Sequence, residues 1–233
     1  MKLNKLILAS ALLLGTLSGR AQFVPEFDDS HMPMNQPCEV LASDSSVTKG
    51  VLKMCMQMSG KLKSFAVKPD DGSDKKKFKA EDVIIVRMKP SNLQRIAETV
   101  NASSNKVNVP NVIDCKWIYY EMVKMPKSGN SALLQRLNPG RNNDKLKVYV
   151  DPDGSLQTSQ ISPNTSTPLI GGKGPSYLIV QEGGGNAMVV SKKKYKEQFN
   201  SIFTNCPDFA TKAGDMEWEN FPTHVAIYNN SCK

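Results

Sequence analysis

The stretch Val51-Leu52-Lys53-Met54-Cys55-Met56-Gln57-Met58 decides the predicted fold. Leu52 and the three methionines alternate with polar residues and Cys55, so they fall on one face of an extended strand. This pattern is typical of a half-buried strand. The simplest interpretation of the methionine face is a buried one, because methionine fills gaps in protein cores. Ser59-Gly60-Lys61 then predicts a hairpin turn into a second strand over 62–68.

Further short apolar segments separated by turn residues predict more strands. These segments are 83–86, which is apolar on both faces, then 117–123, 132–137, 145–150, 177–181 and 187–190. Their spacing indicates a mainly β (α+β) protein, with an antiparallel β-meander or an open barrel-like sheet and about two covering helices.

Two segments carry helical periodicity. A capping residue at Ser91 begins a helix that the apolar pattern continues to Val100. A second helix is expected over about 191–204, with an aromatic stripe. Lys192–Lys194 would oppose the dipole at its N-terminus, so a helix that begins nearer Tyr195 is favoured over a bound anion.

Residues 1–21 have the three parts of a cleavable signal peptide: a positive start, an apolar run over 6–14, and small residues before a cut after Ala21. The apolar run is shorter than the roughly 20 residues that cross a bilayer. The first cysteine is Cys38, so no lipid-anchoring cysteine stands at the cut. The sequence therefore predicts an exported protein, periplasmic or extracellular, with no transmembrane span.

The remaining chain divides by composition. Residues 22–48 are acidic and rich in proline, which predicts an extended N-terminal lead-in, with order beginning near Val51. Residues 49–233 form the β-rich globular region, with a possible division near 101–111. The Ser-, Thr-, Gly- and Pro-rich segment 151–176 has no apolar periodicity, and so long an irregular segment is usually functional or disordered.

Several motifs together resemble a known group of proteins. They are Leu134–Gly140, Lys147–Pro152, Ser176-Tyr177, Lys194-Tyr195, Phe203 with Cys206-Pro207, and the Ala21-Gln22 junction. This set resembles small exported proteins from the Bacteroidetes group of bacteria, over residues 132–207, or about a third of the chain. The resemblance implies a cell with two membranes, and hence the periplasm or the exterior. It implies no chemistry, because such proteins have no assigned function.

The chain has five cysteines, an odd number, and no C-x-x-C motif. An oxidising compartment allows disulfides, but wide spacing leaves the connectivity open. The pair that we favour is Cys206 with Cys232, because that bridge would fix an otherwise untethered C-terminal tail.

No catalytic residue and no cofactor is predicted. The chain has two histidines, His31 and His224, and neither lies in a hydrolytic motif. Asp70-Asp71 and Asp151-Pro152-Asp153 lie in turns, where aspartate is favoured for hydrogen bonds to its own backbone. Gly171–Gly174 lacks the spacing of a phosphate-binding loop.

Methionine is the one unusual feature: His31-Met32-Pro33-Met34 joins an imidazole to two thioethers, and Met54, Met56 and Met58 line one strand face. Soft sulfur ligands suit Cu(I), so His31, Met32 and Met34 are the candidate metal ligands.

The leading hypothesis is a non-enzymatic binding or structural module of the bacterial envelope, acting through its sheet surface and residues 151–176. The alternatives are a periplasmic copper-handling protein and a hydrolase of unrecognised type. The net charge is +8, but the basic residues form no clustered stripe along the sequence, so nucleic acid is not an expected partner. The expected partner is an envelope protein or a surface glycan.

Overall fold

The computed structural model describes residues 23–24, 26, 33–91, 116–126, 129–140, 144–154, 175–204, 206–207 and 209–232. The strands are β1 Pro37–Ala42, β2 Val47–Met58, β3 Lys61–Pro69, β4 Lys76–Lys79, β5 Val83–Met88, β6 Ile118–Lys124, β7 Ser131–Arg136, β8 Leu146–Val150, β9 Ser176–Gln181 and β10 Met188–Ser191. The helices are η2 Ala80–Asp82, η3 Lys192–Lys194, α3 Tyr195–Ile202, α4 Phe209–Ala213, η4 Trp218–Asn220 and α5 Phe221–Ser231. The expected mainly β fold with a few short helices is confirmed.

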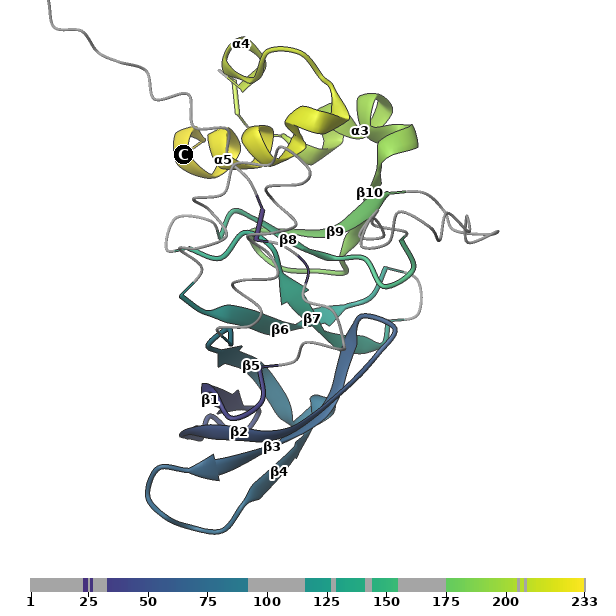
Figure 1. The fold of residues 1–233 in the computed structure, drawn as a ribbon. Helices are drawn as coiled ribbons and strands as arrows, with labels where there is room; N and C mark the ends of the chain where they lie inside the picture. The colour runs from purple at the N-terminus through teal and green to yellow at the C-terminus, as the bar shows by residue number, and fades with distance from the viewer. Residues whose placement is uncertain are drawn as a thin grey trace, which may run out of the picture.

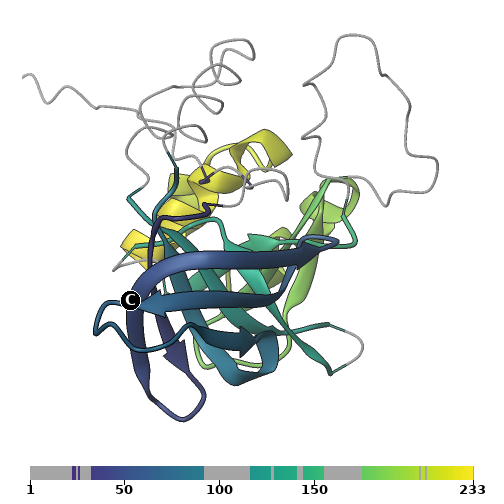
Figure 2. The ribbon, with the colours of Figure 1, turned by 60° about the horizontal axis from the view of Figure 1, so that its bottom comes forward.

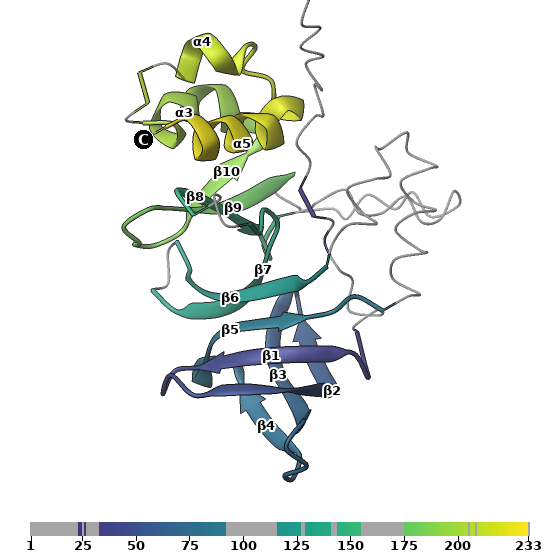
Figure 3. The same cartoon turned by 90° about the vertical axis from the view of Figure 1, so that its left-hand side faces the viewer.

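Six strands close into an antiparallel barrel in the order β3-β7-β6-β5-β1-β2, and β2 returns to β3. The closing contact is short: only Lys61 with Leu134 and Leu62 with Leu133 pair between β3 and β7. Ser59 and Gly60 join β2 to β3 with positive φ at both positions, which is the turn geometry that matches the twist of a hairpin. The barrel forms the lower part of the molecule in Figures 1 and 3.

Two strands of the barrel continue outside it. β3 also pairs with the edge strand β4, and β7 continues into β8, β9 and β10. The barrel has its own core, in which Leu52, Phe65, Val86 and Tyr120 are fully enclosed. The extension β8–β10 has a separate core, which it shares with the helices above it.

The helical layer is an aromatic cluster. Its rings are in mutual contact and come from α3, α4, α5 and the segments between them: Tyr195, Phe199, Phe203, Phe209, Phe221, His224 and Tyr228. A disulfide between Cys206 and Cys232 joins the end of α5 to the segment after α3, with the two Cα atoms 5.2 Å apart. This is the pair favoured from the sequence. The C-terminal residues are therefore a packed layer and not a tail.

Other expectations need correction. β1 lies inside the predicted lead-in 22–48, so the sheet begins before Val51. The lysine run expected in a turn continues into the strand β4. Ile84, expected in a strand buried on both faces, is 41% exposed on β5. The start of α3 at Tyr195 agrees with the start that we favoured.

The helix expected after Ser91, the proposed division near 101–111 and residues 155–174 of the irregular segment lie outside the described residues. None of the described helices is long and apolar enough to cross a membrane.

Candidate functional site

A β-bulge at Lys53 reverses which side chains of β2 face the barrel interior. Leu52 pairs with Val67 and the next matched pair is Met54 with Ala66, so Lys53 is an extra residue on β2. Because side chains alternate with period two, one extra residue moves every later side chain to the opposite face.

The two sides of β2 beyond the bulge show this reversal. Cys55 packs against the barrel core, and Gln57 accepts a hydrogen bond of 3.2 Å from the buried Tyr120 hydroxyl. Met54, Met56 and Met58 are instead 39%, 48% and 58% exposed. The expectation of a buried methionine face is therefore wrong, and we call these three residues the methionine row.

The strands beside the methionine row complete a distinct surface, the outer hairpin face, formed by β2, β3 and β4. Across it, Met54 pairs with Ala66 and Ala66 with Lys77. Met56 pairs in the same way with Ser64, and Ser64 with Lys79. Small side chains thus separate the thioethers from a lysine row, Lys77 and Lys79. These strands are the blue ribbons nearest the viewer in Figure 2.

The segment that forms the outer hairpin face is basic, so the expectation that the positive charge of the chain is not clustered is wrong here. Residues 49–79 contain nine lysines and three aspartates, with no arginine or glutamate. Among the described residues, the one ion pair that these lysines form is between Lys79 and Glu81, at 3.6 Å and largely exposed. Such an exposed pair contributes little, so the positive charge of this face is not neutralised by the described part of the chain.

Of the predicted metal ligands, His31 and Met32 lie outside the described residues, and Met34 lies in the turn before β1. Met34 is 39% exposed. The N–H of Asn35 donates to the carbonyl of Leu52 at 2.8 Å, and the Lys53 ammonium donates to the Asn35 side chain at 3.1 Å. The structure therefore brings the segment of Met34 against β2 at the end of the methionine row.

The second histidine is a packing residue. His224 is fully buried; its Nδ1 lies 2.6 Å from the Tyr195 hydroxyl and its Nε2 lies 3.0 Å from the Ala213 carbonyl. A carbonyl only accepts, so Nε2 carries the proton and Nδ1 accepts from Tyr195. Burial lowers the pKa of His224, which favours this neutral form.

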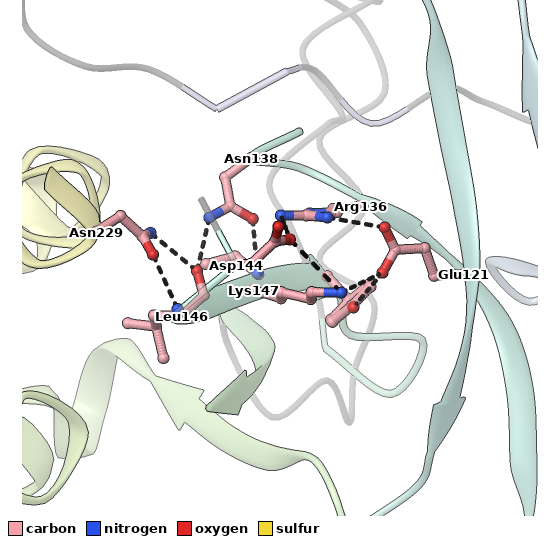
Figure 4. A network of polar contacts seen from close by, with 9 residues as sticks. Glu121, Arg136, Asn138, Asp144, Leu146, Lys147 and Asn229 are labelled. Atoms are coloured by element: carbon pink, nitrogen blue, oxygen red, sulfur yellow. Dashed lines mark hydrogen bonds and ion pairs between the residues drawn. The ribbon is translucent and has the colours of Figure 1, made fainter. Parts of the chain in front are cut away.

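A buried polar network lies where β7 leaves the barrel (Figure 4). Arg136 donates to Glu121 at 2.9 Å and to Asp144 at 3.0 Å, and the Tyr149 hydroxyl donates to Glu121 at 2.8 Å. Lys147 lies 3.3 Å from Glu121. No signal in the sequence singled out these residues beyond the presence of charge inside predicted strands.

The network holds fixed charges. Burial alone would raise the pKa of Glu121, but Arg136, Tyr149 and Lys147 together hold it below the ordinary value. Burial and the neighbouring Glu121 carboxylate raise the pKa of Tyr149 well above its usual range. Glu121 stays ionised and Tyr149 stays protonated near neutral pH, so neither group is suited to exchange protons there.

Amide side chains complete the network next to β8. Asn229 of α5 bonds to both the N–H and the carbonyl of Leu146, at 2.9 and 3.0 Å. Asn138 bonds to the carbonyl of Leu146 and the N–H of Val148, each at 2.8 Å. These amides satisfy backbone groups of β8 and join α5 to the sheet, which is a structural role (Figure 4).

The remaining candidate groups serve local structure. Asp151 accepts from the Ser176 hydroxyl at 2.7 Å and from the N–H of Asp153 at 3.1 Å, and Asp71 accepts from the N–H of Ser73 at 2.8 Å. The two contacts with backbone N–H groups are turn contacts, and the contact with Ser176 ties the Asp151 turn to the start of β9. Burial, with smaller effects of nearby carboxylates, raises the pKa of the Cys38 thiol to about 12.

The described residues therefore offer one surface that combines exposed apolar side chains with unneutralised charge, the outer hairpin face. No three His, Cys, Asp or Glu side chains in the described part of the chain are grouped so as to hold a metal ion. No family model, no curated protein and no solved structure matches this chain.

Proposed function

We propose that this chain is an exported, non-enzymatic binding module of the bacterial envelope, and that the outer hairpin face binds an acidic protein. The observation that carries the proposal is the exposure of the methionine row beside unneutralised lysines. Contiguous apolar residues rimmed by polar ones mark interaction sites on protein surfaces.

The composition of this face fits a protein partner. Methionine is enriched in the centres of protein interfaces, where its flexible side chain adapts to the partner. Lysine is depleted from such centres, but at a rim it steers an oppositely charged partner. The methionine row supplies the apolar centre here, and the lysine row supplies the positive rim.

Charge complementarity selects the class of partner. The segment that forms this face, residues 49–79, contains nine lysines and three aspartates, and its excess of positive charge attracts a surface rich in carboxylates. Export rests on the leader-like residues 1–21. The segment 151–176, the other expected contact region, remains a prediction. The copper alternative, predicted at His31, Met32 and Met34, is extended to the methionine row in the next subsection. No described group favours the hydrolase alternative.

The test is site-specific photocrosslinking in the native host. A photoreactive residue at Met56 should capture an acidic protein. The same residue at Ile84, an equally exposed apolar position on β5, should not. Replacing Lys77→Glu and Lys79→Glu together should abolish the capture from Met56, because these charges lie across the same face.

Two outcomes would overturn the proposal. The first is the same set of crosslinked proteins from Met56 and Ile84. The second is capture that persists after both lysines are reversed in charge. Crosslinking of carbohydrate alone would transfer the site to a surface glycan and reject the protein partner.

A further inference from the structure

We infer that the methionine row, together with Met34, is a binding site for Cu(I) built from thioether sulfurs. This inference does not rest on the docking proposal, since it requires only that these sulfurs be exposed and close along one strand. The expected ligands from the sequence were His31, Met32 and Met34. The sequence offers Met54, Met56 and Met58 as the weaker half of that site, because it favours them as core residues, and their exposure in the structure brings them forward as ligands.

The spacing along the strand allows neighbouring sulfurs to approach one ion. Residues two apart on one face of a strand are separated by about 6.8 Å. Methionine has three rotatable bonds beyond its backbone, and these side chains are only partly enclosed, so neighbouring thioethers can turn toward each other. The row therefore offers adjacent pairs, Met54 with Met56 and Met56 with Met58.

Met34 adds a donor from a distant part of the sequence. Its turn is fixed against β2 by the hydrogen bond from Asn35 to Leu52, two residues before Met54. The side chain of Met34 is exposed like that of Met54, at 39% each. A set of soft donors from two segments is a more specific arrangement than alternation on a single strand.

The donor chemistry selects the ion. Thioethers are soft, neutral ligands that suit Cu(I), whereas Mg²⁺, Ca²⁺ and Mn²⁺ prefer oxygen and Zn²⁺ takes thiolate or imidazole. The lysines of this face repel hydrated cations that bind mainly through charge. Cys55 lies between the methionines in sequence but faces the barrel core, so its sulfur is on the opposite side of β2.

Two properties would distinguish this site from one made of thiolates or carboxylates. A thioether carries no proton, so binding releases none and the affinity should be the same from about pH 5 to pH 8. The nearby lysines oppose a cation, so added salt should strengthen binding by screening them. A carboxylate site shows the reverse salt dependence.

The experiment is an anaerobic titration of the mature chain with Cu(I) in competition with bicinchoninate, a chromogenic Cu(I) chelator. The variant Met54→Leu/Met56→Leu keeps the apolar volume and removes the soft donors. It should weaken Cu(I) binding by about tenfold or more. The matched control is Met216→Leu, which removes an equally exposed thioether (42%) outside the barrel and should change nothing.

A third variant, Cys55→Ser, tests the thiol and should leave the affinity unchanged. The inference fails if the wild-type chain does not compete for Cu(I), or if the double leucine variant binds as tightly as wild type. It also fails if Cys55→Ser alone removes binding.

The two proposals on this face separate cleanly. The double leucine variant keeps the apolar contact, so it should bind Cu(I) more weakly but still be captured by the acidic partner, with the photoreactive residue then placed at Met58. Lys77→Gln/Lys79→Gln should lose the partner and keep Cu(I). The failure of one proposal therefore leaves the other standing.

Discussion

Replacing Arg136→Met tests whether the buried network stabilises the junction between the barrel and β8. The Arg136 side chain is 7% exposed and donates to Glu121 at 2.9 Å and to Asp144 at 3.0 Å. Methionine keeps most of the apolar stem and removes both charged contacts. Glu121 then remains almost fully buried, with only Tyr149 and Lys147 as partners.

The expected loss follows from these contacts. Breaking a buried ion pair by removing one partner costs about 3–5 kcal/mol. We expect about 3 kcal/mol, the lower end, because Tyr149 and Lys147 still satisfy the Glu121 carboxylate. The measurement is the free energy of unfolding from urea titrations.

The loss should also depend on pH. In the wild type the folded-state pKa of Glu121 is lowered, so its contribution is present above its ordinary pKa and is lost as pH falls through the folded-state value. In the variant, fewer positive groups oppose the effect of burial, so the folded-state pKa of Glu121 is higher than in the wild type. The difference in stability between the two proteins should therefore be larger at neutral pH than near pH 4.

Arg87→Met is the matched control. Arg87 also pairs with a glutamate on a neighbouring strand, Glu39 at 2.6 Å, but the side chains are 36% and 25% exposed. It also lies over the ring of Trp117, at 4.6 Å from the centroid. Removing the exposed pair and the ring contact together should lower the free energy of unfolding by about 1 kcal/mol. Equal losses at Arg136 and Arg87, or a loss at Arg136 that does not change with pH, would refute the reasoning.

Three other perturbations have definite expected results. Opening the disulfide with Cys206→Ser/Cys232→Ser should cost about 3–4 kcal/mol for a separation of 26 residues, measured by urea unfolding; an unchanged midpoint would contradict a constraining role. His224 has a lowered folded-state pKa, so its contribution to stability is present above its ordinary pKa and is lost as pH falls below about 6.5. Thermal unfolding measures this loss of stability, which should be absent in His224→Gln. Gly50→Ala should destabilise the barrel, because the new Cβ would collide with the backbone carbonyl of Lys68, and a variant with wild-type thermal stability would show that the two strands lie farther apart.

The sequence predicts most of the sheet because its strands carry local signals. The turn at Asn138–Gly140 and the apolar segments around it mark β7 and β8 at nearly their observed bounds. Short β4 gave no such signal, since three of its four residues are lysines. α5 was missed because its buried side includes His224 and Asn229, which weaken the apolar periodicity.

The candidate site could not be predicted for a different reason. The alternation of β2 is real, but the bulge at Lys53 depends on how β2 pairs with β3, and no single strand encodes that pairing. Barrel closure is equally non-local, because it depends on two residue pairs between β3 and β7. Polar residues such as Glu121 and Arg136 look exposed from the sequence, and only the packing of β8 beside them buries them.

The central claim is that the bulge turns the methionine row outward, and limited oxidation with hydrogen peroxide tests it most directly. Peptide mass spectrometry measures sulfoxide formation at each methionine, and the rate of formation reports the exposure of the sulfur. We predict that Met54, Met56 and Met58 oxidise as fast as the exposed Met216, while the buried Met88 is protected. Protection of the methionine row to the same degree as Met88 would place it in the core and contradict the account.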